Sequence, residues 1–288
     1  MMTVMAGATI APSLPEMTKA FPDNPSAETL VKLVLTIPGL FIALTSPISG
    51  WFIDKFGRIK LLAFMLLLYA AAGSSGLYLD TLFEIIVGRA FLGIAVGGIM
   101  TTAVALIGDY YEGNERQQFL GTQAGIMALS GMVFITFGGI LADVSWRYPF
   151  AIYLLALLAI PLVLIFLKEP QREQVKNTKK SDSTIPKLAW TIFIISFLGM
   201  VTFYLMPVQI PFLIQEIADV GNTETGLAIA TVMLIGGITS FQYPRLKTRL
   251  THYQIYGLTF LFINSIKSWK VKSRLLLTGY LRMTKRKN

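Results

Sequence analysis

Long apolar runs separated by short polar breaks dominate the pattern of this 288-residue chain. A helix needs about 20 mostly apolar residues to cross a bilayer, and most of the runs have that length. The strands of a membrane barrel would need only about ten residues each. We therefore predict an all-α polytopic membrane protein. The expected spans are 1–15 (short), 30–53, 59–79, 81–108, 118–142, 148–167, 187–214 and 225–243, followed by a stunted run at 253–263.

One long polar connector, residues 168–187, follows the sixth apolar run. Its place predicts a six-helix N-terminal half over 1–167, whose first helix is clipped, and a partial second half over 188–263. Residues 264–288 carry eight Lys or Arg side chains and no acid. This basic tail is either a juxtamembrane segment that binds anionic lipid or sequence foreign to the parent, as after a frameshift. The abrupt end of the apolar pattern favours the second explanation.

Composition narrows the class of protein further. Hydrophobic residues make up 54% and charged residues 14% of the chain, whereas charged residues are about 25% of a typical soluble domain. Disorder and an ordinary soluble globule are therefore excluded. The absence of cysteine excludes a disulfide scaffold, and a single histidine argues against a protein-built metal site. The spans hold no Ser/His/Asp set and no phosphate-binding glycine loop, so we expect neither an enzyme nor a cofactor.

The net charge of +9 belongs almost wholly to the basic tail, because the rest of the chain is nearly neutral. It is therefore no evidence for a nucleic-acid partner. Loops on the same side of the membrane as the 54–60 loop hold thirteen Lys or Arg residues, and the opposite loops hold three. This asymmetry predicts that the 54–60 loop and the central linker are cytoplasmic. The expected partners are a small-molecule substrate and membrane lipids, and we expect a monomer.

The most informative stretch is GWFIDKFGRIK, residues 50–60, between the second and third spans. Gly50, near a helix end, would let a neighbouring helix approach closely. Asp54 and Arg58 are four residues apart and would share a face if the helix continued between them. Gly57 suits a tight reversal between the spans. A basic loop with a turn glycine has the same features in many polytopic proteins, so these residues alone leave the function open.

This stretch resembles the hallmark loop of the major facilitator superfamily, a large family of secondary transporters. The family pattern is G-x-x-x-D-(R/K)-x-G-R-(R/K)-(R/K), and the matching positions are Gly50, Asp54, Lys55, Gly57 and Arg58. The loop departs from the pattern at Ile59. The resemblance implies a helical bundle of two six-helix halves with the substrate path between them. This chain would supply eight helices and part of a ninth, and would be truncated at both ends.

The fourth span carries a second similarity to the family. Its residues Arg89, Gly93 and Gly97 match the family pattern R-x-x-x-G-x-x-x-G. A charged side chain inside a span is costly and is therefore a functional candidate, unless it reaches an interface by snorkelling. Glycines four residues apart form a stripe along which another helix packs closely.

The resemblance also implies a conformational latch. Asp109, at the cytoplasmic end of the fourth span, would join Asp54 and Arg58 in a charge cluster that locks the outward-facing state. Residues 145–150 (SWRYPF) look like a junction common in drug-exporter branches of the family. Residues 134–139 (FITFGG) keep the two glycines of the exporter signature G-P-x-x-G-G but lack its Gly-Pro, which weakens the case for export by antiport.

Polar side chains inside the spans are weaker candidates. Gln123, Tyr204 and Gln209 either line a substrate path or hydrogen-bond between helices, and the second role is the commoner one. Taken whole, the resemblance implies a secondary active transporter in a bacterial plasma membrane. It would export a small molecule, a drug or a metabolite, by alternating access with proton coupling. The alternative is a truncated remnant that does not transport, or an interaction protein.

Overall fold

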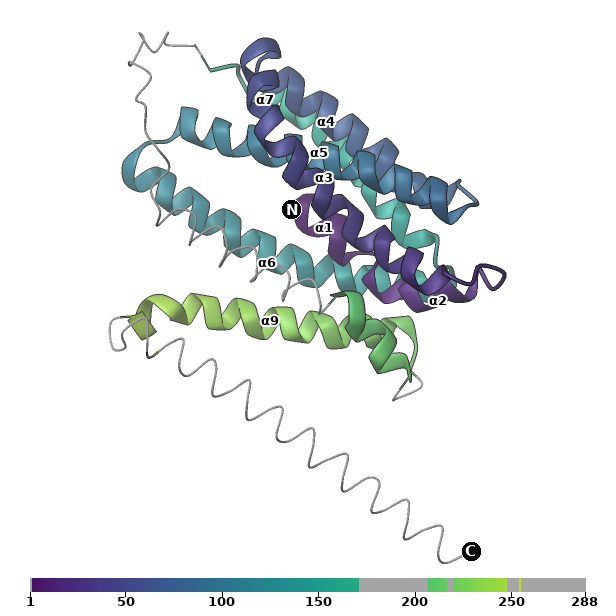
Figure 1. The fold of residues 1–288 in the computed structure, drawn as a ribbon. Helices are drawn as coiled ribbons and strands as arrows, with labels where there is room; N and C mark the ends of the chain where they lie inside the picture. Colours follow the sequence, from purple (N-terminus) through teal and green to yellow (C-terminus); the bar gives the residue numbers. More distant parts are fainter. Residues whose placement is uncertain (1, 171–206, 217–219, 248–253, 255–288) are drawn as a thin grey trace, which may run out of the picture. The chain divides into compact units, whose positions relative to one another are not determined.

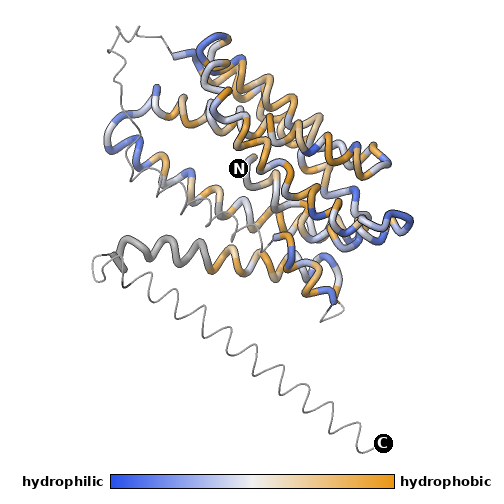
Figure 2. The backbone as a smooth tube through the Cα atoms, viewed as in Figure 1, coloured by the Kyte–Doolittle hydropathy of each residue, from blue (hydrophilic) through white to orange (hydrophobic). Residues whose placement is uncertain are grey.

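The computed structural model describes residues 2–170, 207–216, 220–247 and 254. Most of these residues are helical and none of them lies in a strand, which confirms the predicted all-α class. Figure 2 shows apolar positions along most of the length of the helices. The helices that are long and apolar enough to cross a membrane are Ala27–Phe56, Arg58–Leu77, Leu82–Tyr110, Gly113–Val144 and Tyr148–Phe166.

The chain divides into two compact units, Met1–Ile235 and Gly236–Asn288. The contacts reported below lie in the first unit. The predicted boundaries of the linker at 168–187, of the second half at 188–263 and of the tail at 264–288 fall largely outside the described residues. They stay predictions.

The first apolar run is broken rather than continuous. It forms α1 (Met2–Ala8), the 3-10 turn η1 (Ala11–Ser13) and α2 (Leu14–Lys19), where we predicted one short span. Pro12 and Pro15 explain the breaks, because each lacks a backbone N–H and stands in the first turn of a new helical piece. The segment is nevertheless fully buried at Ile10 and Leu14.

Helices α3 (Ala27–Phe56) and α5 (Leu82–Tyr110) form the most extensive helix pair of the bundle. Helix α4 (Arg58–Gly73), continued by the turn η2 (Ser74–Leu77), packs against α5 and also against α7 (Ala156–Phe166). Figure 1 shows these helices side by side. A capping box begins α5, since the side chains of Thr81 and Glu84 each accept a hydrogen bond from the other's backbone N–H.

Helix α6 (Gly113–Val144) begins five residues before the predicted start at 118. The turn that separates it from α5 lies at Gly113, whose φ of +53° favours glycine. The polar residues 114–118 then continue the helix beyond the apolar run. Their hydrophilic character predicts a break, but polar residues extend a helix freely where it meets water.

The sixth span, predicted as one helix over 148–167, begins with the 3-10 segment η3 (Tyr148–Leu155) before α7. Two glycines of the α4–η2 segment make room for its aromatic rings. A Cβ added at Gly76 would lie 2.4 Å from Phe150, and one added at Gly73 would lie 2.5 Å from Tyr153. The rings therefore pack directly against backbone.

Two segments that follow the linker contact helices that precede it. Residues 207–216 are helical, and α9 covers Asn222–Lys247. Val208 belongs to the main core, and Ile229 of α9 packs with Ile135 of α6. The predicted spans 187–214 and 225–243 are thus helical where they are described, while the run at 253–263 lies outside the described residues except at 254.

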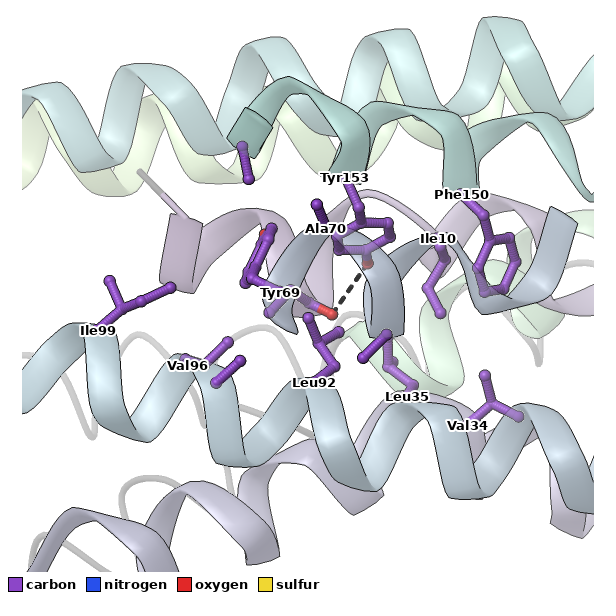
Figure 3. Close-up of a cluster of buried hydrophobic side chains, with 14 of the residues drawn as sticks. Ile10, Val34, Leu35, Tyr69, Ala70, Leu92, Val96, Ile99, Phe150 and Tyr153 are labelled. Carbon is purple, nitrogen blue, oxygen red and sulfur yellow. Dashed lines mark hydrogen bonds between the residues drawn. The ribbon is translucent and has the colours of Figure 1, made fainter. Parts of the chain in front are cut away.

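The main core joins α1, α3, α4, α5 and η3. Figure 3 shows Tyr69 and Tyr153 at its centre, with Ile99 and Phe150 toward its two ends. The ring centroids of the two tyrosines are 5.6 Å apart. The Tyr69 hydroxyl donates to the carbonyl of Met2 over 2.8 Å, and the Tyr153 hydroxyl also bonds carbonyls of α1. Buried tyrosines thus satisfy their polar ends on the broken first segment.

We predict that Gly93→Ala lowers the free energy of unfolding by about 1–3 kcal/mol, the usual cost of overpacking. The new Cβ would lie 2.5 Å from the Pro38 carbonyl oxygen of α3, so the two helices would have to separate. Unfolding in mixed dodecylmaltoside–SDS micelles measures the change. Gly121→Ala on α6 is the matched control, because its Cβ meets no heavy atom within 4 Å. Equal stability of the two variants would contradict the close α3–α5 contact.

Candidate functional site

Arg58 and Asp109 form an ion pair between α4 and α5. Helix α3 ends at Phe56, Gly57 reverses the chain with a φ of +89°, and α4 begins at Arg58. The Arg58 Nε lies 2.7 Å from Asp109 Oδ2, and its Nη2 lies 3.4 Å from Oδ1. The two side chains are 16% and 28% exposed. We call this end of the bundle the Arg58 end.

Glu169, just beyond α7, binds the start of α4 at the same place. Its Oε1 accepts a hydrogen bond from the Arg58 N–H over 2.6 Å, and its Oε2 accepts one from the Ile59 N–H over 3.0 Å. The first N–H groups of a helix have no partner within the helix, and their positive partial charge attracts a carboxylate. A Cβ on Gly57 would lie only 3.0 Å from Oε1, so the glycine also makes room for this carboxylate.

A further hydrogen bond closes the set, because the Tyr110 hydroxyl donates to the carbonyl of Lys168. The segment after α7 is therefore tied to the beginning of α4 and to the end of α5. We call Arg58, Asp109 and Glu169 the charged cluster.

Arg89 is completely buried in the bundle interior. Its Nε donates to the Val34 carbonyl over 3.1 Å, and its Nη2 donates to the Ala6 carbonyl over 2.7 Å and to the Tyr153 hydroxyl over 3.0 Å. The guanidinium carbon lies 5.0 Å from the ring centroid of Tyr153 and 5.6 Å from that of Phe150. Carbonyl oxygens and aromatic faces therefore stabilise the charge. Among the described residues, Nη1 has no hydrogen-bond partner.

Glycines along α5 place Arg89 and Asp109 on a helix that lies very close to α3. A Cβ at Gly93 or Gly97 would lie 2.5 Å or 3.2 Å from a carbonyl oxygen of α3. Another pair of glycines, Gly138 and Gly139 on α6, would meet the carbonyl oxygens of Thr9 and Asn222 at 2.0 Å and 2.6 Å. Close backbone approach thus recurs where helices cross.

Comparison with known proteins decides the family. A sequence profile of the Major Facilitator Superfamily matches residues 1–265. The chain belongs to this superfamily. It is accordingly a multi-pass membrane protein, in agreement with its apolar helices.

Relatives of known or inferred function include drug-resistance proteins. The class H tetracycline resistance protein of Pasteurella multocida is 25% identical over 236 residues, which cover 77% of this chain and 58% of that protein. Quinolone resistance protein NorB of Staphylococcus aureus is 25% identical over 250 residues, with coverages of 86% and 50%. YwfA of Bacillus subtilis, an uncharacterized MFS-type transporter, is 29% identical over 233 residues, with coverages of 76% and 55%. The chain spans about half the length of the curated relatives it matches.

Solved transporter structures share the fold. A crystal structure of a D-xylose–proton symporter aligns with a TM-score of 0.63 at 14% identity, covering 86% of this chain and 67% of that one. A bacterial homolog of the human lysosomal transporter Spinster, inward-facing and occupied, aligns with a TM-score of 0.62 at 16% identity, with coverages of 88% and 62%. These likenesses concern the fold, an MFS-type helical bundle.

Of the residues predicted for the latch, Arg58 and Asp109 form an ion pair. Asp54 is exposed on α3, whereas Arg58 begins α4, so these two residues do not lie on one continuous helix. Gly57 separates the two helices. Lys55 lies over the ring of Trp51, 5.0 Å from its centroid. The close helix approach expected at Gly50 is also not found among the described residues, because no heavy atom lies within 4 Å of its added Cβ.

Sequence reasoning missed Glu169. The only local signal is an acid two residues after the sixth apolar run, between Lys168 and Pro170. Its partners lie more than 100 residues earlier in the chain, so no spacing rule connects them.

The predicted substrate-path residues remain predictions. Gln123 is half-buried on α6, Gln209 is exposed in the helix at 207–216, and Tyr204 lies outside the described residues. No group of three or more metal-ligating side chains gathers in the part of the chain that the structure describes.

We expect Glu169→Ala to lower the free energy of unfolding by about 1 kcal/mol, the typical value of a helix N-cap. The loss arises because the first N–H groups of α4 no longer have an acceptor inside the fold. Unfolding in mixed micelles measures it. The control is Glu112→Ala, an exposed acid at the same end whose side chain makes no cap hydrogen bond. A Glu169→Ala protein no less stable than the control would contradict the capping role.

Arg89→Lys tests the buried guanidinium. A lysine ammonium cannot reach the Val34 and Ala6 carbonyls together, so at least one charged hydrogen bond is lost, at a cost of about 2 kcal/mol. Thermal unfolding of the purified protein should show a clear decrease in midpoint. Arg116→Lys, at an exposed position near the start of α6, should leave the midpoint unchanged. An unaffected Arg89→Lys protein would show that the carbonyl bonds contribute little.

Proposed function

We propose that this superfamily member is a secondary active transporter that exports a small organic molecule across a bacterial plasma membrane by alternating access. The observation that carries the proposal is the charged cluster, in which Arg58 and Asp109 pair and Glu169 binds the first turn of α4. Helices α4 and α5 and the segment after α7 are thereby held together at one end. The contacts are non-covalent, and the side chains of the ion pair are partly exposed.

Such a cluster suits a reversible lock. Its side chains are partly exposed to water, so the separated charges regain hydration when the pair opens. Ion pairs near a surface therefore contribute little net stability and are easily exchanged. Two conformations that differ by a few kcal/mol are both populated, and a substrate that binds one of them better shifts the equilibrium.

The distribution of charge supports the proposed orientation. Lys and Arg in loops are concentrated on the side of the 54–60 loop and the central linker, and such loops remain in the cytoplasm. The charged cluster would then act as a cytoplasmic latch that also includes Asp54 and Lys55. Membrane lipids and the substrate would be its partners, and the protein would work as a monomer without a cofactor.

The substrate class comes from the relatives, which are named for resistance to tetracycline and quinolones. We infer an amphipathic drug or metabolite as substrate, with export driven by protons. Proton coupling is inferred from the family resemblance, because the contacts of Arg89 are carbonyls, a hydroxyl and aromatic rings rather than an acid. The chain spans about half the length of these relatives. The alternative is a remnant that does not transport, and the experiment below distinguishes it from a transporter.

The experiment expresses the 288-residue chain in a bacterial strain that lacks its own efflux pumps. We expect lower accumulation of tetracycline or a quinolone than in an empty-vector strain. Asp109→Asn should reduce the initial efflux rate by about tenfold, within the range of coupling between two conformational states. Immunoblots of membranes verify equal insertion.

Asp80→Asn is the matched control, because Asp80 is an exposed aspartate that pairs with Arg147 at the opposite end of the bundle. It should retain the efflux rate of the parent chain. Full efflux by Asp109→Asn would refute the latch, and an inserted parent chain without drug-dependent flux would refute transport by this polypeptide.

A further inference from the structure

A carboxylate also joins two helices at the end of the bundle opposite Arg58. Asp143 is the penultimate residue of α6, and α9 begins at Asn222. Asp143 Oδ1 accepts a hydrogen bond from the Asn222 N–H over 2.8 Å. Its Oδ2 accepts one from the Thr223 N–H over 3.2 Å and another from the Thr223 hydroxyl. Both oxygens are therefore bound to the first turn of α9. We call this the Asp143 end.

Gly221 explains why the cap comes from another helix. It occupies the position before α9, where a Ser, Thr, Asp or Asn side chain would normally bind the first free N–H groups. Glycine has no side chain to do so. A Cβ there would lie 3.3 Å from Asp143 Oδ1 and 2.8 Å from Glu224 Oε2. Asp143 thus supplies, from 79 residues before the start of α9, the cap that α9 lacks.

Other contacts at the Asp143 end involve the helix at 207–216 and the middle of α9. The Lys32 ammonium of α3 lies 4.9 Å from the ring centroid of Phe212. Gln215, in the same helix, donates to the Asn222 side chain over 2.9 Å and so joins that helix to the start of α9. Backbone approaches backbone below the carboxylate, since a Cβ on Gly226 of α9 would lie 2.9 Å from the Ile135 carbonyl oxygen. The helices before and after the linker are therefore closed against each other here.

We propose that Asp143 is a positioning residue that holds this end of the transport path closed. It clasps α9 in the conformation described here and releases it when the end opens. The Asp143 side chain is exposed, so water can take over the bonds of both the carboxylate and the freed N–H groups. A cap from within α9 would stabilise that helix only. The Asp143 contact, which we call the clasp, caps α9 and also joins it to α6. This inference rests on the proposed alternating-access function.

The test uses the natural absence of cysteine. Thr225→Cys places a single thiol one turn into α9, at a fully buried position whose hydroxyl bonds only the Gly221 carbonyl in the structure. The full chain is placed in lipid nanodiscs, where both faces are accessible, and the rate of labelling by a membrane-impermeant maleimide is measured. No transport is required for this readout.

Added to Thr225→Cys, Asp143→Ala should raise the labelling rate by about tenfold, the factor that loss of one charged hydrogen bond gives. Asp80→Asn, which removes an exposed aspartate bound to Arg147 within the N-terminal helices, should leave the rate unchanged. If Asp143→Ala does not yield folded protein, Asp143→Asn keeps the shape and one acceptor and should still raise the rate. An unchanged rate in the folded variant overturns the proposal.

Gly221→Ser separates the clasp from simple capping. Added to Asp143→Ala, it gives α9 a local cap and should restore the thermal midpoint, while labelling stays fast because α6 and α9 remain unjoined. Recovery of both the midpoint and slow labelling would show that Asp143 only caps α9, which overturns the clasp. If Asp143→Ala raises the labelling rate but the chain exports no drug, the role of Asp143 stands and the transport proposal fails. If the chain exports drug but the labelling rate does not change, only the role of Asp143 is refuted.

Discussion

A guanidinium that is buried among helices needs acceptors, and Arg89 finds them on three other segments. Its bonds reach Ala6 of α1, Val34 of α3 and Tyr153 of η3, while the residue itself lies on α5. Much of the rest of the bundle is arranged around this requirement. Helix α1 of the broken first segment presents backbone carbonyls to this centre, and Tyr69 and Tyr153 also bind carbonyls of α1. A polar centre therefore ties the interior together where apolar packing alone would leave helices free to slide.

Both ends of the bundle use one physical device. At each end a carboxylate from a distant segment binds the first N–H groups of a helix, Glu169 on α4 and Asp143 on α9. At each end the residue before that helix is a glycine, Gly57 or Gly221, which has no side chain with which to cap it. The free N–H groups of the helix start are thereby available to a carboxylate from another segment, and the helix start is capped only while that carboxylate is in place. A contact of this kind joins segments without hydrophobic burial, so it can form and break in water.

The middle of the bundle works differently from the ends. Glycines on α5 and α6 let backbones approach so closely that even a methyl group would not fit. Contacts of this kind are rigid, because nothing in them can rotate away. The bundle thus combines tightly packed helix pairs with exchangeable polar contacts at the rims. In a member of a transporter family, that division suits rigid-body movement about a packed centre.

The sequence by itself determined the helical class, the approximate place of the apolar helices between residues 27 and 166, and the loop that carries Arg58. These follow from the length of apolar runs, which the bilayer dictates, and from spacing within a few residues. It also singled out Arg89, because a charge inside a span is conspicuous without any knowledge of its neighbours. The same reasoning misplaced the start of α6 and treated η3 as ordinary helix.

Only the tertiary structure decided which residues meet. Glu169 and Asp143 find their partners across roughly 80 to 110 residues. Nothing in their local sequence indicates that either carboxylate will accept hydrogen bonds from the start of a distant helix. The depth of Arg89, and whether a glycine packs like Gly93 or stands open like Gly50, depend on how two helices cross. Crossing geometry arises from the fit of whole surfaces, and local periodicity does not encode that fit.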